Sequence, residues 1–205
     1  MQTKSKTIII TVSLAALVLL VLLWLKRKGD NKMEAKNATD NRKTATGLVR
    51  YAQAQLGRPY WWGTSGQIST ETLLNSLKKL YPDTYAKPMY ANAPQQLGQK
   101  VHDCMGLIEG YFWSENPDAP AKYNSNGFTD TTADRLYAAA TEKGDISTIP
   151  EIPGLAVHTN GHIGVYIGNG QVIDAYGHAK GVIQSPLKRT NKPWKHWLKI
   201  PGLEY

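Results

Sequence analysis

The chain has 205 residues, of which 41% are hydrophobic and 20% are charged, a composition typical of a globular protein rather than of a disordered one. Its single cysteine, Cys104, excludes an intrachain disulfide, so this residue is a free thiol, a metal ligand or an intermolecular link. The formal net charge is +8, but five of these charges precede the first acidic residue, and residues 29–205 keep only +3. This small excess argues against nucleic acid as a partner.

The basic N-terminal residues bracket an uncharged, almost continuously apolar segment, Thr7–Leu25. As a helix it would span about 28 Å, close to the hydrocarbon thickness of a bilayer. A cleaved signal peptide is the alternative, but the apolar run is long for one and no small-x-small cleavage site precedes the basic residues 26–28. We therefore expect residues 1–28 to be a membrane anchor and the polar residues 29–43 to be a flexible linker.

Helical patterns dominate the first part of the remaining chain. Residues 44–57 combine a threonine N-cap, an apolar stripe and a terminal glycine, and residues 69–82 repeat the helical spacing until Pro82 ends it. Residues 84–101 show no clean period and are expected to be irregular. A further helix is expected to start at Cys104, after Asp103 as its N-cap, and a shorter one covers residues 131–144.

The C-terminal third has the alternating pattern of strands. Residues 161–176, "GHIGVYIGNGQVIDAY", alternate and contain a Gly-Asn-Gly turn that joins two strands, and further short strands are expected over Gly181–Gln184 and Trp197–Ile200. Helices followed by strands predict an α+β domain in which N-terminal helices pack on a C-terminal antiparallel sheet.

The length of the turn decides which face of the sheet receives Asp174. A two-residue loop would turn this carboxylate toward the apolar side chains, where an unpaired charge is strongly disfavoured. A three-residue loop over Gly168–Gly170 pairs Ile167 with Gln171 instead. Asp174 then shares a face with His162, as its diagonal neighbour and within reach of a long side chain.

Cys104 has two interpretations. At a helix N-terminus, the free amide N–H groups and the helix dipole would lower the pKa of the thiol and could stabilise an oxyanion. A small buried cysteine that merely fills the interface between helices and sheet is the commoner case. Catalysis would also require a base, and His162 is the candidate, although a lone strand histidine is more often a surface residue.

Three blocks, "GRPYWWG", "HDCMGLI" and "GHIGVYIGNGQVIDA", resemble in their joint occurrence and order the signature blocks of the NlpC-type cell-wall endopeptidases, a papain-related family. The resemblance covers roughly residues 45–200. It implies a papain-like core in which Cys104 is the nucleophile, His162 the base and Asp174 the third, polar member. His178 lies on the same face and is an alternative orienter of the base.

The resemblance also implies residues that contact the substrate. Tyr60 matches a family tyrosine near the nucleophile, although a core aromatic is an equally good interpretation of it, and Trp62, Asp103 and His178 are expected beside it. Met105 stands where many relatives have a serine that helps to recognise a free amino end, which argues against that recognition here. An insertion over about residues 67–101 is expected to wall one side of the cleft.

The resulting expectation is a membrane-anchored hydrolase of peptidoglycan stem peptides, with the γ-D-glutamyl–diamino acid bond as the first candidate and the catalytic domain outside the cytoplasmic membrane. An amidase or acyltransferase on the same fold, and an inactive wall-binding protein, are the alternatives. We expect no cofactor and no metal, since neither H-x-x-x-H nor C-x-x-C spacing occurs. The basic cluster Lys188–Lys199 could contact anionic wall polymers, but a solvated surface is the simpler interpretation.

Overall fold

The computed structural model of the protein describes residues 43–205. The expected membrane anchor, residues 1–28, and all but the last residue of the expected linker lie outside the described residues. Among the helices of residues 43–205, none has the length and apolar character needed to cross a membrane. Lys43–Tyr205 folds as one unit.

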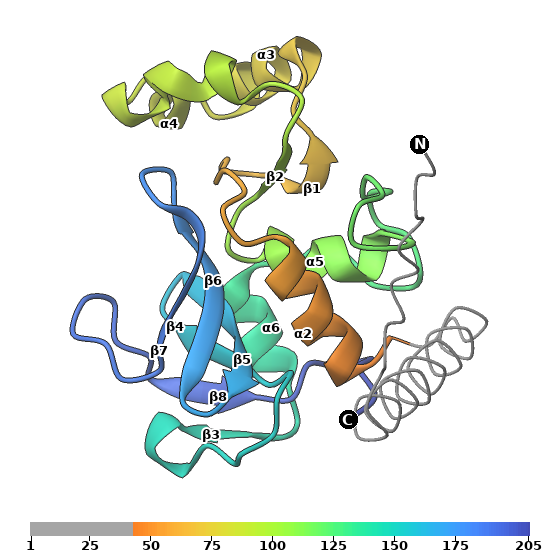
Figure 1. Cartoon of the computed structure of the whole chain (residues 1–205), viewed down its shortest axis with the longest axis vertical. Coiled ribbons are helices and arrows are strands. Elements are labelled where there is room, and N and C mark those ends of the chain that lie inside the picture. The colour runs from red at the N-terminus through yellow and green to blue at the C-terminus, as the bar shows by residue number, and fades with distance from the viewer. Residues whose placement is uncertain (1–42) are drawn as a thin grey trace, which may run out of the picture. The chain divides into compact units, whose positions relative to one another are not determined.

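A six-stranded antiparallel sheet forms the centre of this unit (Figure 1). Its strands are, in spatial order, β3 (Lys143–Asp145), β8 (His196–Leu198), β4 (Ala156–Thr159), β5 (His162–Gly168), β6 (Gln171–Gly177) and β7 (Gly181–Pro186). The predicted α+β architecture with an antiparallel sheet is therefore confirmed.

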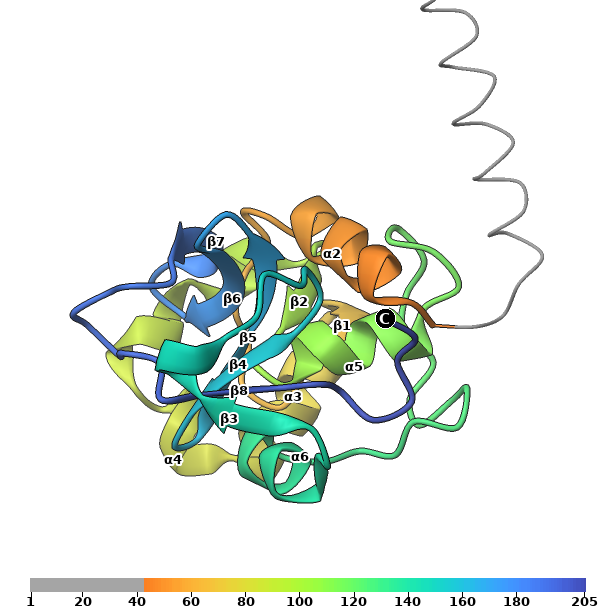
Figure 2. The ribbon, with the colours of Figure 1, turned by 90° about the horizontal axis from the view of Figure 1, so that it is seen from below.

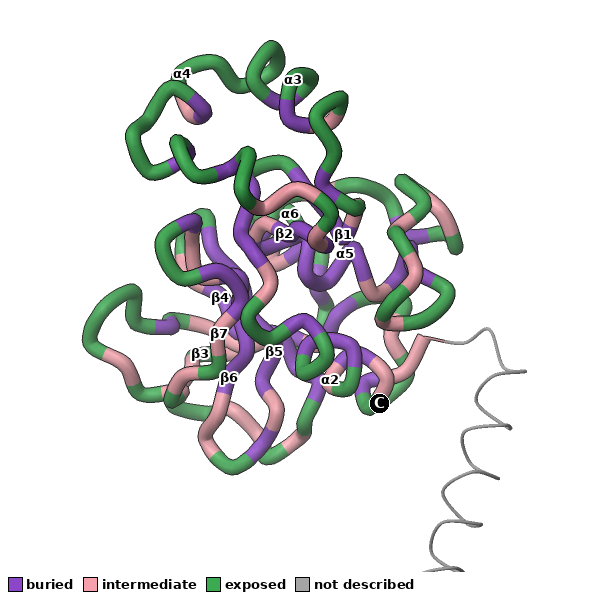
Figure 3. The backbone as a smooth tube through the Cα atoms, turned by 45° about the horizontal axis from the view of Figure 1, so that its top comes forward, coloured by how far each residue is buried: buried purple, intermediate pink, exposed green. Residues whose placement is uncertain are grey.

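Three helices cover one face of the sheet, α2 (Ala45–Ala54), α5 (Gly106–Trp113) and α6 (Ala133–Ala139), as Figure 2 shows. The strand residues alternate between the two faces. Ile163 and Ile173 belong to the main core with the helices, whereas Tyr166 and Val172 pack with Trp194 in a second cluster. In Figure 3 the buried segments run through α5 and the central strands, whereas much of the outer part of the insertion is exposed.

The insertion forms a small layered substructure of its own. Strands β1 (Ser65–Ile68) and β2 (Lys100–His102) pair antiparallel and frame helices α3 (Glu71–Leu80), α4 (Pro82–Tyr85) and the 3₁₀ helix η1 (Pro88–Gln96). Its apolar cluster consists of Trp61, Leu74, Leu77, Tyr85, Tyr90, Ala93 and Val101. The expectation of irregular structure over residues 84–101 was wrong, because a 3₁₀ helix has a period of three and leaves no pattern at 3.6.

The predicted helix over residues 131–144 was too long. Helix α6 ends at Ala139, and Ala140 is already extended with ψ 132°. Lys143 and Gly144 instead pair with Leu198 and Trp197 of β8. Long-range strand pairing overrides the helix propensity of the alanine-rich segment here.

The turn between β5 and β6 combines both loop lengths considered from the sequence. Asn169 and Gly170 form a two-residue turn with φ 51° and 64°, so Gly168, and not Ile167, pairs with Gln171. Gly168, at φ 88°, allows an irregularity in the ladder directly before the turn. Beyond it the register is the one predicted for the three-residue loop, with Val165 opposite Ile173.

Candidate active site

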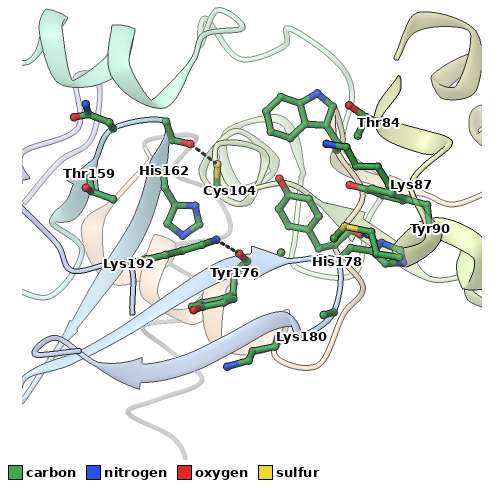
Figure 4. A pocket seen from close by; sticks show the side chains of 17 residues that line it. Thr84, Lys87, Tyr90, Cys104, Thr159, His162, Tyr176, His178, Lys180 and Lys192 are labelled. Atoms are coloured by element: carbon green, nitrogen blue, oxygen red, sulfur yellow. Dashed lines mark hydrogen bonds between the residues drawn. The ribbon is translucent and has the colours of Figure 1, made fainter. Parts of the chain in front are cut away.

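A pocket of about 720 Å³ opens between the sheet and the insertion. Its walls come from the aromatic loop around Tyr60, from residues 84–90 of the insertion, from residues 159–162 and from residues 176–180, with Cys104 and Lys192 completing the lining. Figure 4 shows Cys104 and His162 facing this pocket from different elements. The sulfur and the imidazole, 58 positions apart in the chain, therefore line one cavity.

Asp103 fixes the position of Cys104. Its Oδ1 accepts a hydrogen bond from the Gly106 amide at 2.7 Å and its Oδ2 accepts one from the Gly63 amide at 2.9 Å. The regular helix begins at Gly106 rather than at Cys104, so the predicted start was two residues early. The Leu107 amide nevertheless donates to the Asp103 carbonyl at 3.1 Å, so Cys104 lies in a helical turn.

Gly106 brings this helix against the loop that carries Tyr60. A Cβ at position 106 would lie 1.9 Å from the Thr64 carbonyl oxygen, so only glycine fits the approach. The glycine two residues after the cysteine thus sets how closely Cys104 approaches the aromatic loop.

The Cys104 thiol is 7% exposed and donates to the carbonyl oxygen of Gly161, with 3.8 Å between the sulfur and the oxygen. Burial, followed by the negative charge of Asp103, raises the pKa of the thiol to about 12. The amides of Ile163, Met105 and Cys104 act in the opposite direction but do not outweigh burial. The expectation of a lowered thiol pKa at the helix N-terminus was therefore wrong. Removal from water destabilises the thiolate by more than the hydrogen bonds from the amides stabilise it.

His162 and Asp174 form a close pair. The Nε2 of His162 lies 2.6 Å from Oδ2 of Asp174, whose side chain is fully buried. Since Nε2 is engaged, Nδ1 is the nitrogen left to exchange a proton in the pocket. Trp194 stacks on the imidazole at 5.4 Å between centroids with 9° between the planes, which restricts the rotation of the ring.

Arg189 neutralises the buried carboxylate. Its Nη1 donates to both oxygens of Asp174, at 3.0 and 3.2 Å, and its guanidinium lies 4.0 Å from the centroid of Trp194. Arg189 and Trp194 lie in the basic cluster that was expected to be solvated, and this role was not predicted from the sequence. Asp174 could have indicated this role, because a buried carboxylate needs a cation or several hydrogen-bond donors as partners.

The remaining predicted residues divide into two groups. Tyr60, Trp62 and His178 line the pocket, and the Trp62 side chain is 43% exposed. Asp103 does not belong to the lining, and both of its oxygens are already bonded to amides. Burial and the nearby charge of Asp103 raise the pKa of Tyr60, so its hydroxyl stays protonated and can donate.

His178 does not contact His162. Its Nδ1 lies 2.8 Å from the Tyr60 carbonyl oxygen and its Nε2 lies 2.6 Å from Oδ1 of Asn92 in the insertion. Its ring also packs on Tyr90 at 4.2 Å. The structure therefore places Asp174, and not His178, beside the imidazole of His162, while His178 ties the insertion to the aromatic loop. Within residues 43–205, no group of three or more His, Cys, Asp or Glu residues is arranged to hold a metal ion.

Solved structures similar to this chain include the P60 domain of a Mycobacterium avium subspecies paratuberculosis antigen, with 18% identity, a TM-score of 0.43 and coverage of 78% of this chain and 96% of that one. The peptidoglycan hydrolase RipB of Mycobacterium tuberculosis has 19% identity and a TM-score of 0.44, with 94% and 87% covered. The NlpC/p60 domain of the peptidoglycan hydrolase SagA has 15% identity and a TM-score of 0.44, with 77% and 99% covered.

Among curated proteins, none matches the chain. The NlpC/P60 family matches residues 57–201, which include all three blocks singled out in the sequence and every residue of the pocket. This match covers well over half of the chain. The protein therefore belongs to the NlpC/P60 family, as the blocks predicted, and is an enzyme of that family.

Proposed function

We propose that the protein hydrolyses an amide bond in the stem peptides of peptidoglycan, with the γ-D-glutamyl–diamino acid bond as the first candidate. One observation carries the proposal: Cys104 and His162 line a single open pocket, and Asp174 holds the imidazole from its far side. This is the nucleophile, base and orienter arrangement of thiol hydrolases. Membership of the NlpC/P60 family supports the substrate class.

In the proposed reaction, the sulfur of Cys104 attacks the carbonyl carbon of the amide while Nδ1 of His162 takes the thiol proton. The raised pKa of the thiol favours proton removal by a base over a preformed thiolate. Asp174 stabilises the imidazolium that forms. The amide N–H groups at the front of α5 and the hydroxyl of Tyr60 are the donors available to the oxyanion.

The tetrahedral intermediate then breaks its carbon–nitrogen bond, and His162 gives the proton to the departing amine. A water molecule, deprotonated by His162, attacks the resulting thioester. The carboxylic acid leaves, and the sulfur regains its proton from the imidazolium. The cycle consumes one water molecule and needs no redox partner.

We further propose that residues 1–28 anchor the protein in the cytoplasmic membrane with the enzyme domain on the outer side. The apolar run Thr7–Leu25 supports the anchor, and the location of peptidoglycan supports the orientation. Protease added to intact spheroplasts should digest the domain, and the full chain should stay with the membrane fraction after a salt wash.

Purified sacculi incubated with the full-length protein in detergent test the proposed chemistry. Mass spectrometry should find fragments with a new amino group on the diamino acid, and the Cys104→Ala and His162→Ala variants should release none. His196→Ala is the matched control, since this histidine lies outside the pocket lining. Cleavage at another amide would point to an amidase, and binding without cleavage by the wild type would point to a wall-binding protein.

A further inference from the structure

The pocket is positively charged. Three lysines, Lys87, Lys180 and Lys192, contribute to its lining, and none of the lining residues is Asp or Glu. All three are exposed, and within residues 43–205 none of them forms an ion pair with a carboxylate. Like charges brought together without acidic partners repel one another and raise the local concentration of anions.

Three carboxylates near the pocket are bonded to other groups. Asp103 accepts hydrogen bonds from the amides of Gly63 and Gly106. Asp174 is buried between His162 and Arg189. Asp134 accepts hydrogen bonds from His158 and from the amide of Gly161, and it lies outside the pocket lining. All three carboxylates are therefore bonded to other groups, and none of them forms an ion pair with the three lysines.

Two of the lysines flank Tyr176 on the sheet side of the pocket. Their Nζ atoms lie 4.7 Å (Lys180) and 4.4 Å (Lys192) from the centroid of its ring. Lys192 has φ 53°, a left-handed conformation that is uncommon outside glycine and that functional sites often contain. Arg189 Nε donates to the Lys192 carbonyl at 2.9 Å, and Lys192 Nζ donates to the Tyr176 carbonyl at 2.7 Å.

The third lysine faces them from the insertion. Lys87 lies between α4 and η1, next to Thr84 and Met89 in the lining. In the close view of Figure 4, Lys87 comes from the insertion side of the pocket, and Lys180 and Lys192 come from the sheet side. A peptide that fills the pocket of Cys104 therefore meets ammonium groups on its insertion side and on its sheet side.

We propose that these lysines select a substrate that carries free carboxylates on the residues flanking the cleaved amide, and that they discriminate against the corresponding carboxamides. This inference rests on the proposed function. The expected ligand of these lysines is a carboxylate of the peptide substrate. The lysines line the same pocket as Cys104, so a group that contacts them is part of the molecule whose amide bond reaches the sulfur. A carboxamide has the same size but no charge, so it loses the attraction.

Binding to the full-length Cys104→Ala protein tests the inference without requiring cleavage. The probes are two synthetic stem peptides, identical except that one carries α-carboxylates and the other carboxamides at the residues on either side of the amide. Calorimetry should show the carboxylate peptide binding roughly tenfold more tightly, since three partly screened charge contacts contribute. The difference should shrink as salt is raised.

The lysine variants are made on the same background. Lys87→Met, Lys180→Met and Lys192→Met should each reduce the preference, and the triple variant should bind both peptides equally. Lys192→Arg keeps the charge and should keep the preference, whereas Lys192→Gln keeps a donor for the Tyr176 carbonyl without the charge and should reduce the preference. Lys79→Met, in the last turn of α3 and outside the pocket lining, is the matched control and should change nothing.

Equal binding of the two peptides by the parent protein would overturn the inference, because it would show that the charges do not contact the substrate. If the triple variant then also loses the binding of polyphosphate that the parent shows, the lysines serve an anionic polymer instead. A preference for the carboxylate peptide in the Cys104→Ala protein, together with no cleavage of either peptide by the wild type, would support this inference and contradict the proposed hydrolysis.

Discussion

The Nε2 of His162 lies 2.6 Å from Oδ2 of Asp174, a contact that depends on the ladder irregularity between Tyr166 and Gly168. Without this irregularity, the pairing of β5 with β6 would be shifted by one residue. Asp174 would then point into the main core, because a one-residue shift moves every side chain of a strand to the opposite face of the sheet. The close approach of Asp174 on β6 to strand β5 also requires a glycine at position 164 of β5. A Cβ on Gly164 would lie 2.9 Å from the Cβ of Asp174.

Replacing Asp174 by asparagine should remove the charge that stabilises the imidazolium while keeping the size of the side chain. We expect kcat/KM toward a stem peptide to fall by a factor on the order of 10²–10⁴. The free energy of unfolding should fall by about 3 kcal/mol, because Arg189 becomes a buried charge without a full partner. Steady-state kinetics and urea denaturation measure the two effects.

The double variant Asp174→Asn with Arg189→Met separates activity from stability. Removing both charges should restore much of the unfolding free energy, since a buried ion pair contributes less than the cost of leaving one member alone. Activity should stay low. Full activity of the single variant Asp174→Asn would show that this carboxylate does not act through His162.

Much of this architecture could be predicted from local patterns. Helical spacing indicated α2, α3 and α5, and the cost of burying a charge placed Asp174 on the face of His162. The parts that escaped prediction depend on distant contacts. Strand β3 exists because Lys143 pairs with Leu198. The 3₁₀ helix η1 has three residues per turn, so its apolar residues do not follow the 3.6-residue spacing of an α-helix.

The same limit applies to the charges at the site. Arg189 and Lys192 lie in a loop without periodicity, where a basic residue normally faces solvent. Only the folded chain shows that Arg189 reaches a buried carboxylate and that Lys192 reaches the carbonyl of Tyr176. The pKa of Cys104 is a similar case, because the burial that outweighs the helix N-terminus depends on packing across the whole interface.

The raised pKa of Cys104 predicts how its reactivity depends on pH in the substrate-free enzyme. With a pKa of about 12, the thiolate fraction grows by about tenfold for each pH unit between pH 7 and 10. Alkylation by iodoacetamide should follow this slope, and the label maps to one site because the chain has a single cysteine. Free glutathione, the control, should level off near pH 9. A rate that is already constant at pH 6 would instead reveal a preformed thiolate–imidazolium pair.

Glu109, on the helix that follows Cys104, should make the protein less stable as pH rises. Burial raises its pKa to about 8, above the usual 4.5, although the Thr131 amide and the Ser65 hydroxyl donate to it. Between these two values the unfolded chain releases its proton first, so stability falls as pH increases and is lowest above pH 8. The loss should be up to about 1 kcal/mol per pH unit.

The variant Glu109→Gln should therefore lose less stability between pH 5 and 8 than the wild type in urea denaturation. Glu115→Gln is the control, because Glu115 is exposed and its pKa is lowered by Lys122. Parallel stability curves for the wild type and Glu109→Gln would mean that Glu109 is ionised in the folded protein throughout this range.

Asp134 should act on the nucleophile through the wall of the pocket. Its Oδ1 accepts hydrogen bonds from the Gly161 amide at 2.9 Å and from His158 at 2.8 Å. The carbonyl of the same Gly161 accepts the bond from the Cys104 thiol. Asp134→Ala removes the side-chain tether of this turn, and we expect kcat/KM to fall roughly fivefold, the equivalent of about one hydrogen bond.

The control for Asp134 is Asp83→Ala, since Asp83 also lies in the first turn of a helix, α4, but not in the pocket lining. Both variants lose an acidic residue near a helix N-terminus, which should cost a few tenths of a kcal/mol of stability. Asp134→Ala also loses the hydrogen bonds to His158 and Gly161, which should cost about 1 kcal/mol more. Only Asp134→Ala should slow peptide cleavage and change the rate of Cys104 alkylation. Equal effects of the two variants on cleavage would mean that Asp134 contributes only through its position at the helix N-terminus. A change in the alkylation rate that occurs only in Asp134→Ala would show that Asp134 acts on Cys104 through Gly161.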